Sequence, residues 1–207
     1  ANANLIVDPA TFESHLQALQ DAGYYTLSPA EAYKILTENV LPQGKKVVWL
    51  TFDDSLADFY SQAYPILTKY QMKATNNVIT GFVENNTAGY LTVDQMLEMK
   101  ENGMSFESHT VSHPDLEYST RDAQIYEMQT SKEFLDANLS QETTIITYPS
   151  GRYNAETGSI AESLGYKLGL TTNEGLASAA DGLFTLNRVR ILPTTTADSL
   201  LATIATE

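Results

Sequence analysis

Two adjacent carboxylates follow directly on an apolar run of this sequence. Asp53 and Asp54 close a stretch that begins with the apolar residues 47–50. In such a pair one carboxylate can bind a metal ion while its neighbour stays free to accept a proton. Taken alone, an Asp-Asp pair after a strand is more often a helix cap or a turn, and Ser55 would extend that cap. Its chemistry therefore depends on the residues that lie nearby.

Two of the three histidines stand four residues apart. His109 and His113 can present two ring nitrogens to one ion if the segment is helical or turns tightly, and Pro114 restricts that turn. An isolated pair with this spacing also occurs at surfaces and caps. With one aspartate it makes a divalent-metal site with open positions, which predicts metal-assisted attack of water on a carbonyl. We interpret His15 as a solvated residue on the polar side of the first predicted helix.

The charge and the cysteine content narrow the chemistry. The 207 residues include 12 basic and 26 acidic ones, a net charge of −14, which is a poor surface for a phosphate backbone and argues against nucleic acid as a partner. A neutral glycan is compatible with that charge, although an acidic surface alone often serves solubility. The absence of cysteine removes disulfides, thiolate ligands and cysteine nucleophiles. No apolar run approaches the roughly 20 residues of a membrane helix.

Capping patterns place helices along the chain. Caps are predicted at Asp8, Ser28, Thr92 and Ser119, and Gly23 is expected just beyond the end of the first helix. Short apolar runs lie between these helices: 47–52, 74–80, 104–108, 143–148, 166–171 and 184–192.

Apolar strands that alternate with amphipathic helices indicate βαβ units and a parallel sheet. Six such strands favour an α/β fold of the (β/α) barrel type over an open doubly wound sheet, as a single domain over residues 1–207. In either fold the active site lies at the carboxyl ends of the strands. The Asp pair, His109 and Tyr148 are therefore expected on one rim.

Three segments in register resemble the polysaccharide deacetylase (NodB-like) domain of carbohydrate esterase family four: residues 51–54, 109–113 and 148–154. The resemblance implies a distorted or incomplete barrel of about seven strands. It also implies hydrolysis of N-acetyl groups from N-acetylglucosamine units of a cell-wall or exopolysaccharide glycan. The implied cofactor is a divalent metal, Zn²⁺ first, with Co²⁺ and Ni²⁺ as alternatives. The implied location is extracellular or on a bacterial cell surface, and we expect a monomer.

Carried over residue by residue, the resemblance makes Asp53 the general base. It gives three metal ligands: Asp54, His109 and His113. It also gives a groove wall that binds substrate through Tyr148, Pro149, Ser150 and Tyr153, with the backbone at Ser150 as the oxyanion donor.

Two departures from the family pattern concern the surroundings of the Asp pair. Ser55 stands where the family usually has Gly, and Ile146 stands where an Arg usually tethers the base. Arg188 or Arg190 of the last predicted strand could replace that tether, and we predict Arg188 as a catalytic residue in this sense. The alternative is that both arginines pair with surface carboxylates.

The third departure concerns the general acid, because no histidine follows His113. The order of the first elements resembles a permuted branch of the family that includes deacetylases of poly-β-1,6-N-acetylglucosamine. In that branch the acid lies in a short strand before a helix like the first one here. We therefore expect a trimmed or processed product, whose first strand and catalytic acid precede Ala1.

Two other functions stay open. One is a glycan-binding domain on the same scaffold that has lost catalysis, with sugar rings stacked on Tyr90, Tyr118, Tyr148 and Tyr153. The other is hydrolysis of a different acyl or amide substrate by the same Asp-His-His set.

Overall fold

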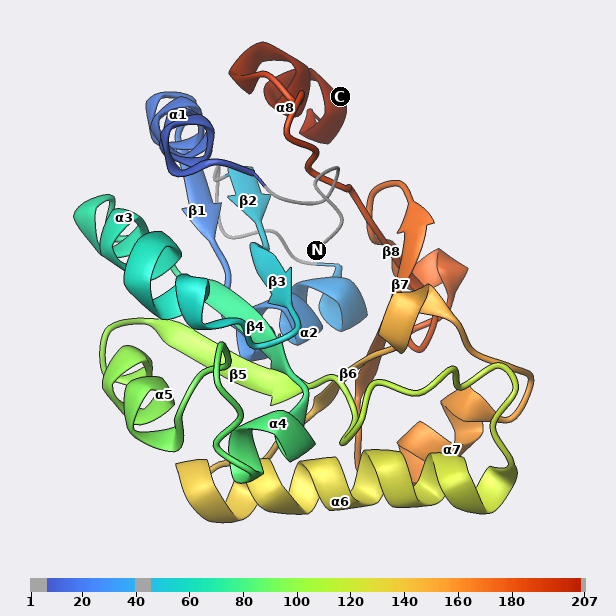
Figure 1. Cartoon of the computed structure of the whole chain (residues 1–207). Helices are drawn as coiled ribbons and strands as arrows, with labels where there is room; N and C mark the ends of the chain where they lie inside the picture. The colour runs from blue at the N-terminus through green and yellow to red at the C-terminus, as the bar shows by residue number, and fades with distance from the viewer. Residues whose placement is uncertain (1–6, 40–45, 206–207) are drawn as a thin grey trace.

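A curled parallel sheet forms the centre of the protein. The structure, a computed structural model, describes residues 7–39 and 46–205. Six strands follow one another in chain order across the sheet: β3 (Thr51–Asp53), β4 (Ala74–Val78), β5 (Met104–Ser108), β6 (Ile145–Thr147), β7 (Leu168–Glu174) and β8 (Leu186–Arg188). All neighbouring pairs in it are parallel. The sheet curls into half a barrel (Figure 1), which confirms the predicted distorted, incomplete (β/α) barrel.

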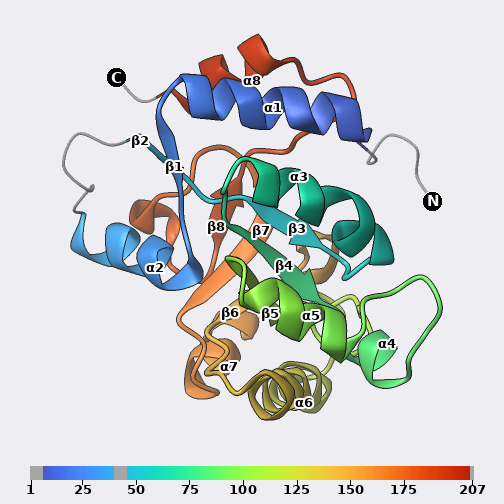
Figure 2. The same cartoon turned by 90° about the vertical axis from the view of Figure 1, so that its left-hand side faces the viewer.

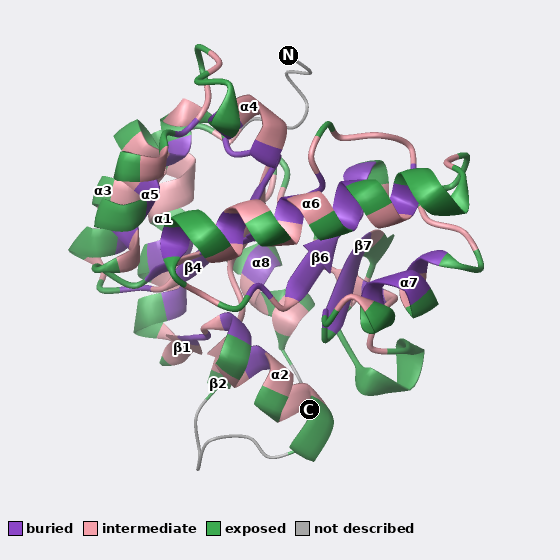
Figure 3. Cartoon of the chain, turned by 90° about the horizontal axis from the view of Figure 1, so that it is seen from below, coloured by how far each residue is buried: buried purple, intermediate pink, exposed green. Residues whose placement is uncertain are grey.

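Helices cover the outside of this sheet (Figure 2). The helical segments are α1 (Pro9–Asp21), α2 (Pro29–Glu38), η2 (Phe59–Ala63), α3 (Tyr64–Lys69), α4 (Thr80–Glu84), α5 (Val93–Lys100), α6 (Arg121–Leu139), η3 (Pro149–Gly151), α7 (Thr157–Ser163), η4 (Ala179–Asp181) and α8 (Ala197–Ile204). The longest, α6, runs along the outside of the sheet and turns its buried residues inward (Figure 3). Within the described ranges, each helix is too short or too polar to cross a bilayer.

The predicted caps form, with one shift. Asp8 accepts from the backbone of the first turn of α1, and Ser28 and Thr92 each complete a capping box. The cap of α6 is Thr120 and not Ser119 as predicted. The hydroxyl of Ser119 donates to the carbonyl of Asp115, and the hydroxyl of Thr120 accepts the backbone N–H of Ala123 in the first turn of α6.

One predicted strand is two strands. The run 47–52 divides into β2 (Lys46–Val48), which pairs with β1 (Tyr24–Thr26), and β3, which pairs with β4. Trp49 stands at the break, and its indole N–H donates to Thr75 of β4. The sequence analysis did not identify β1, because three residues are too few for a strand pattern to show.

His15 is not solvated, contrary to the prediction. Its side chain is 3% exposed, and Nε2 lies 2.7 Å from the carbonyl oxygen of Thr195. The chain from Thr195 leads into α8, which lies beside α1 (Figures 1 and 2). The segment that leads into α8 therefore covers a face of α1 that the sequence pattern of α1 predicts to be polar and solvent-exposed.

Candidate active site

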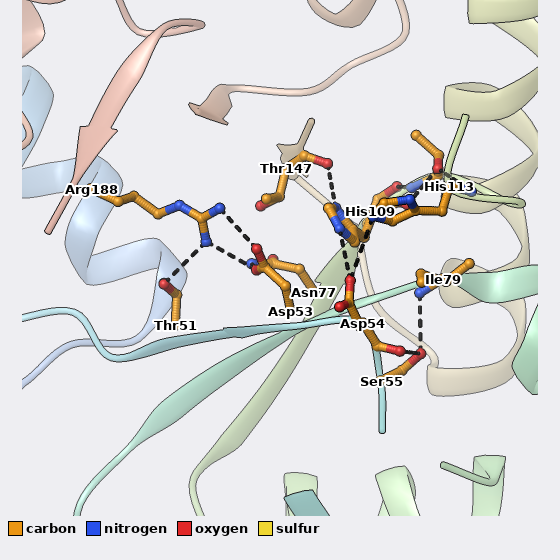
Figure 4. A network of polar contacts seen from close by, with 12 residues as sticks. Thr51, Asp53, Asp54, Ser55, Asn77, Ile79, His109, His113, Thr147 and Arg188 are labelled. Atoms are coloured by element: carbon orange, nitrogen blue, oxygen red, sulfur yellow. Dashed lines mark hydrogen bonds and ion pairs between the residues drawn. The ribbon is translucent and has the colours of Figure 1, made fainter. Parts of the chain in front are cut away.

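The backbone at the end of β3 turns so that two neighbouring carboxylates reach the same rim. Asp53 is the last residue of the strand, and Asp54 has a left-handed φ of 83°. Ser55 continues the turn with φ 53°, and its buried hydroxyl accepts the backbone N–H of Ile79 at 3.3 Å. Because successive residues of a regular strand point to opposite faces, this turn is what brings both side chains into the site (Figure 4).

Asp54, His109 and His113 form the first of two groups, which we call the ligand cluster. Oδ1 of Asp54 lies 3.2 Å from Nε2 of His109 and 3.7 Å from Nε2 of His113. One ligand atom from each of the three residues lies within 4.8 Å of the others. Ligands placed tetrahedrally about 2.0–2.2 Å from a Zn²⁺ ion are roughly 3.3–3.6 Å apart. The cluster therefore fits a small divalent ion in its spacing and in its donor types.

The imidazoles of the ligand cluster are held in the state that binds metal. Nδ1 of His109 lies 2.7 Å from the carbonyl oxygen of Thr147, an acceptor, so it carries the proton and leaves Nε2 free as a ligand. Burial lowers the pKa of His113, and the neighbouring His109 lowers it further. A lowered pKa keeps the His113 ring neutral near pH 7. The segment between the histidines is a tight turn and not a helix, with positive φ at Thr110 and His113.

Asp53, Asn77 and Arg188 form the second group, which we call the base cluster. Nη1 and Nη2 of Arg188 donate to the two oxygens of Asp53 at 3.0 and 2.8 Å. The amide of Asn77 on β4 donates to Oδ1 of Asp53 at 2.9 Å. Arg188 is itself fixed, because its Nε donates to the carbonyl of Thr171 on β7. The base cluster thus joins the ends of β3, β4 and β8 (Figure 4).

This pairing keeps Asp53 ionised. Burial raises the pKa of the carboxyl, but the Arg188 guanidinium, the nearby His109 and the hydrogen bonds from Arg188 and Asn77 together outweigh burial and hold that pKa well below its usual range. A carboxylate has about four positions at which it can accept a hydrogen bond. Residues of the base cluster donate to three of them, two on Oδ1 and one on Oδ2. With the side chain 27% exposed, Oδ2 retains a position at which it can accept a proton from water.

Of the two arginines considered as a tether, the one at the site is Arg188. Arg190 is exposed, and its backbone N–H donates to Glu174. Ile146, at the position where the family has its usual Arg, is fully buried in the core. Asn77 was not predicted as a site residue. The signal for it in the sequence is that a polar residue stands inside the mainly apolar run 74–80.

The predicted groove residues divide between surface and core. Ser150 is exposed, with a left-handed φ of 55°, and Tyr153 is partly buried. Pro149 is buried. The side chain of Tyr148 is fully buried, and its hydroxyl donates to the carbonyl of Phe184. Tyr148 therefore supports the wall from beneath in this structure, and its predicted contact with substrate stays a prediction.

The loop that carries Ser150 is joined to the loop that follows His113. Arg152 pairs with Asp115 at 2.6 Å, and Nδ2 of Asn154 donates to the backbone carbonyls of Leu116 and Glu117. The third sequence motif is thus tied to the loop that follows the second, and together these two loops form the wall that we consider below.

Comparison with known proteins identifies the family. The sequence profile described as polysaccharide deacetylase matches residues 41–169, which is more than half of the chain. The protein YxkH of Bacillus subtilis is 45% identical over 190 residues, which cover 92% of this chain and 67% of YxkH. This chain belongs to the polysaccharide deacetylase family. The resemblance seen in the three motifs is confirmed.

Two further relatives are informative. The poly-β-1,6-N-acetyl-D-glucosamine N-deacetylase of Staphylococcus aureus is 29% identical, over 91% of this chain and 68% of its own length. The crystallised deacetylase PplD of Streptococcus pyogenes, in complex with acetate, is 60% identical. It superimposes with a TM-score of 0.96 over 99% of this polysaccharide deacetylase chain and 90% of PplD.

Proposed function

We propose that this member of the family is a metal-dependent N-deacetylase that removes acetyl groups from N-acetylglucosamine units of a cell-wall or exopolysaccharide glycan. The observation that carries the proposal is the separation of Asp53 and Asp54 into two clusters of different chemistry. One carboxylate faces two imidazoles, and the other is paired with an arginine and keeps a free acceptor position. The names of the Staphylococcus aureus and Streptococcus pyogenes relatives support deacetylation.

The residues have separate roles in this mechanism. Asp54, His109 and His113 hold a divalent ion, with Zn²⁺ the first choice and Co²⁺ or Ni²⁺ as alternatives. When bound, such an ion supplies Lewis-acid chemistry that polarises a carbonyl and promotes the ionisation of water. Asp53 takes the proton from the water that attacks the acetamide carbonyl, and the C–N bond breaks as the amine takes up a proton and leaves, with acetate as the other product. Arg188 keeps Asp53 ionised and oriented.

The wall beside the ligand cluster positions the glycan. The backbone N–H of Ser150 is the proposed donor to the oxyanion, and the exposed left-handed turn at this residue supports that role. Pro149 shapes the turn, and Tyr153 offers a partly exposed ring to a sugar. We also propose that the chain acts as a single-domain monomer outside the cell or on a bacterial surface.

A glycan-binding domain without catalysis is the second candidate. Tyr118 is 79% exposed on the loop after His113, which favours a sugar platform there. Tyr90 stacks on Phe82 with ring centroids 4.6 Å apart, so one face of its ring is already occupied.

The test is to measure metal content and acetate release with β-1,6- and β-1,4-linked N-acetylglucosamine oligomers. Simple esters are measured alongside as competing substrates. We expect acetate release that a chelator abolishes and Zn²⁺ restores. Retained Zn²⁺ and oligomer binding without any acetate release would contradict the enzyme and favour the binding domain. Turnover of the esters alone would point to a different acyl substrate.

A further inference from the structure

A carboxylate of α6 holds the turn between the two histidines. The carboxylate of Glu127 accepts the backbone N–H groups of Val111 and Ser112 at 2.8 and 3.0 Å, and the hydroxyl of Ser112 at 2.5 Å. The residue is 8% exposed and belongs to no ion pair among the described residues. Its charge is therefore compensated by hydrogen bonds from the turn, two of them from main-chain groups.

The opposite side of the turn is held by the start of α4. The backbone N–H groups of Thr80 and Gly81 donate to the carbonyls of Thr110 and Val111 at 3.1 and 2.8 Å. A Cβ atom at Gly81 would lie 2.6 Å from the Val111 carbonyl oxygen, so the contact requires glycine. The turn that carries His109 and His113 is thus held between α4 and α6.

This turn needs such support because its backbone is strained. Thr110 and His113 have φ values of 69° and 62°, a left-handed conformation that is unfavourable for residues other than glycine. Hydrogen bonds from N–H groups to an ionised carboxylate are about twice as strong as neutral ones. Glu127 can therefore offset strain that the turn could not sustain alone.

We propose that Glu127 is a positioning residue that keeps the turn in the shape in which both imidazoles reach one metal ion. The inference rests on the proposed function, because it assumes that the ligand cluster binds metal. It assigns to α6 a part in the metal site that the three sequence motifs do not contain. Partners that orient ligands typically change metal affinity by about 10- to 100-fold when they are removed.

The experiment compares Zn²⁺ affinity, measured by competition with a chelating dye, in three variants. Glu127→Ala should bind Zn²⁺ about tenfold more weakly than the unmodified chain. Glu127→Gln should lose only about threefold, because its amide oxygen can still accept both N–H groups without the charge. Glu133→Ala is the matched control, since Glu133 is an exposed glutamate of the same helix, and should bind like the unmodified chain.

Melting temperatures in the presence of chelator separate positioning from folding. A purely structural role lowers the melting temperature and leaves the affinity of the folded protein unchanged, which would overturn the inference. If Glu127→Ala does not fold, the test rests on Glu127→Gln. A Zn²⁺ affinity of Glu127→Gln equal to that of the unmodified chain would then contradict the inference. Failure of the unmodified chain to bind Zn²⁺ would overturn the proposed function as well. Normal Zn²⁺ binding and acetate release with full affinity in Glu127→Ala would overturn this inference alone.

Discussion

Asp53 and Asp54 are neighbours in the chain, yet their carboxylates belong to clusters of opposite design. The base cluster is built from strand residues, and its aspartate is paired with a full positive charge. The ligand cluster is built from turns with left-handed backbone, and its aspartate faces imidazoles, one of which has a lowered pKa. An arginine beside a carboxylate competes with a metal ion for that carboxylate. An imidazole nitrogen, in contrast, can bind the same metal ion as the carboxylate. The environment therefore distinguishes Asp54, the proposed metal ligand, from Asp53, the proposed base.

The largest expected effect comes from removing a ligand. His109→Ala should lower Zn²⁺ affinity by more than about a hundredfold, because losing a ligand costs more than losing a partner that orients one. Acetate release should fall to background, while the Asp53–Arg188 pair remains intact. Equilibrium dialysis against Zn²⁺ checks this result, with His15→Ala as a control that removes a histidine outside both clusters. Unchanged Zn²⁺ binding in His109→Ala would place the metal elsewhere.

The next effect comes from the base cluster. Arg188→Ala leaves the Asp53 charge without its partner, which costs roughly 3–5 kcal/mol for fully buried pairs. Since these side chains are 18% and 27% exposed, we expect a loss of about 2 kcal/mol in the free energy of unfolding. Turnover should fall, because Asp53 loses its orientation and because burial, no longer opposed by Arg188, raises its pKa and favours the protonated carboxyl, while Zn²⁺ affinity changes little. The stability and turnover of Arg188→Lys should lie between those of the unmodified chain and of Arg188→Ala, because lysine keeps the charge but cannot form the bidentate hydrogen bonds of arginine.

Denaturant unfolding and Zn²⁺ titration of these arginine variants measure both quantities, with exposed Arg190→Ala as the matched control. A drop in Zn²⁺ affinity as large as that of His109→Ala would show that the two clusters are one functional unit.

A smaller effect is expected at Ser55, which links the clusters through the turn. Ser55→Ala keeps the strain of φ 53° and leaves the N–H of Ile79 without its acceptor, which should cost about 1–2 kcal/mol. Ser55→Gly loses the same hydrogen bond but relieves the strain, so it should be about 1 kcal/mol more stable than the Ala variant. Thermal unfolding checks the order, and an Ala variant as stable as the Gly variant would show that the turn is not strained.

The smallest effect concerns Glu31, a paired carboxylate remote from both clusters. Burial opposes its ionisation, but hydrogen bonds from Tyr25 and from the backbone of Ser28 lower the pKa of Glu31 to about 2. Because the pKa is lowered in the folded state, Glu31 stabilises the protein at pH values above its ordinary pKa of 4.5, and this contribution is lost as the pH falls toward about 2. Because the pair with Lys73 is about one-third exposed, we expect less than about 1 kcal/mol.

Unfolding of Glu31→Gln at several pH values tests this contribution. The stability of the variant should depend less on pH than that of the unmodified chain between about pH 4.5 and 2, and its Zn²⁺ binding at pH 7 should be unchanged. An equal pH dependence in both proteins would show that the pairing contributes nothing.

Local sequence signals predicted most of the sheet and the helix starts, because capping and alternation of strand and helix act over a few residues. The Asp pair and the two histidines could be placed on one rim because the carboxyl ends of parallel strands share an edge. Apart from the pairing of Arg188 with Asp53, specific contacts between distant segments could not be predicted. The burial of His15 depends on a loop 180 residues away, and that of Tyr148 on the carbonyl of Phe184. The roles of Asn77 and Glu127 were not predicted because each depends on a partner in another element of the fold.

The division of labour between the two aspartates is tested most directly by comparing Asp53→Asn with Asp54→Asn in the same Zn²⁺ binding and acetate release assays. Asp53→Asn should bind Zn²⁺ with nearly unchanged affinity and release no acetate. Asp54→Asn should lose Zn²⁺ and acetate release together. Acetate release by Asp53→Asn at the rate of the unmodified chain, or loss of its Zn²⁺, would contradict the assignment of one aspartate as base and the other as ligand.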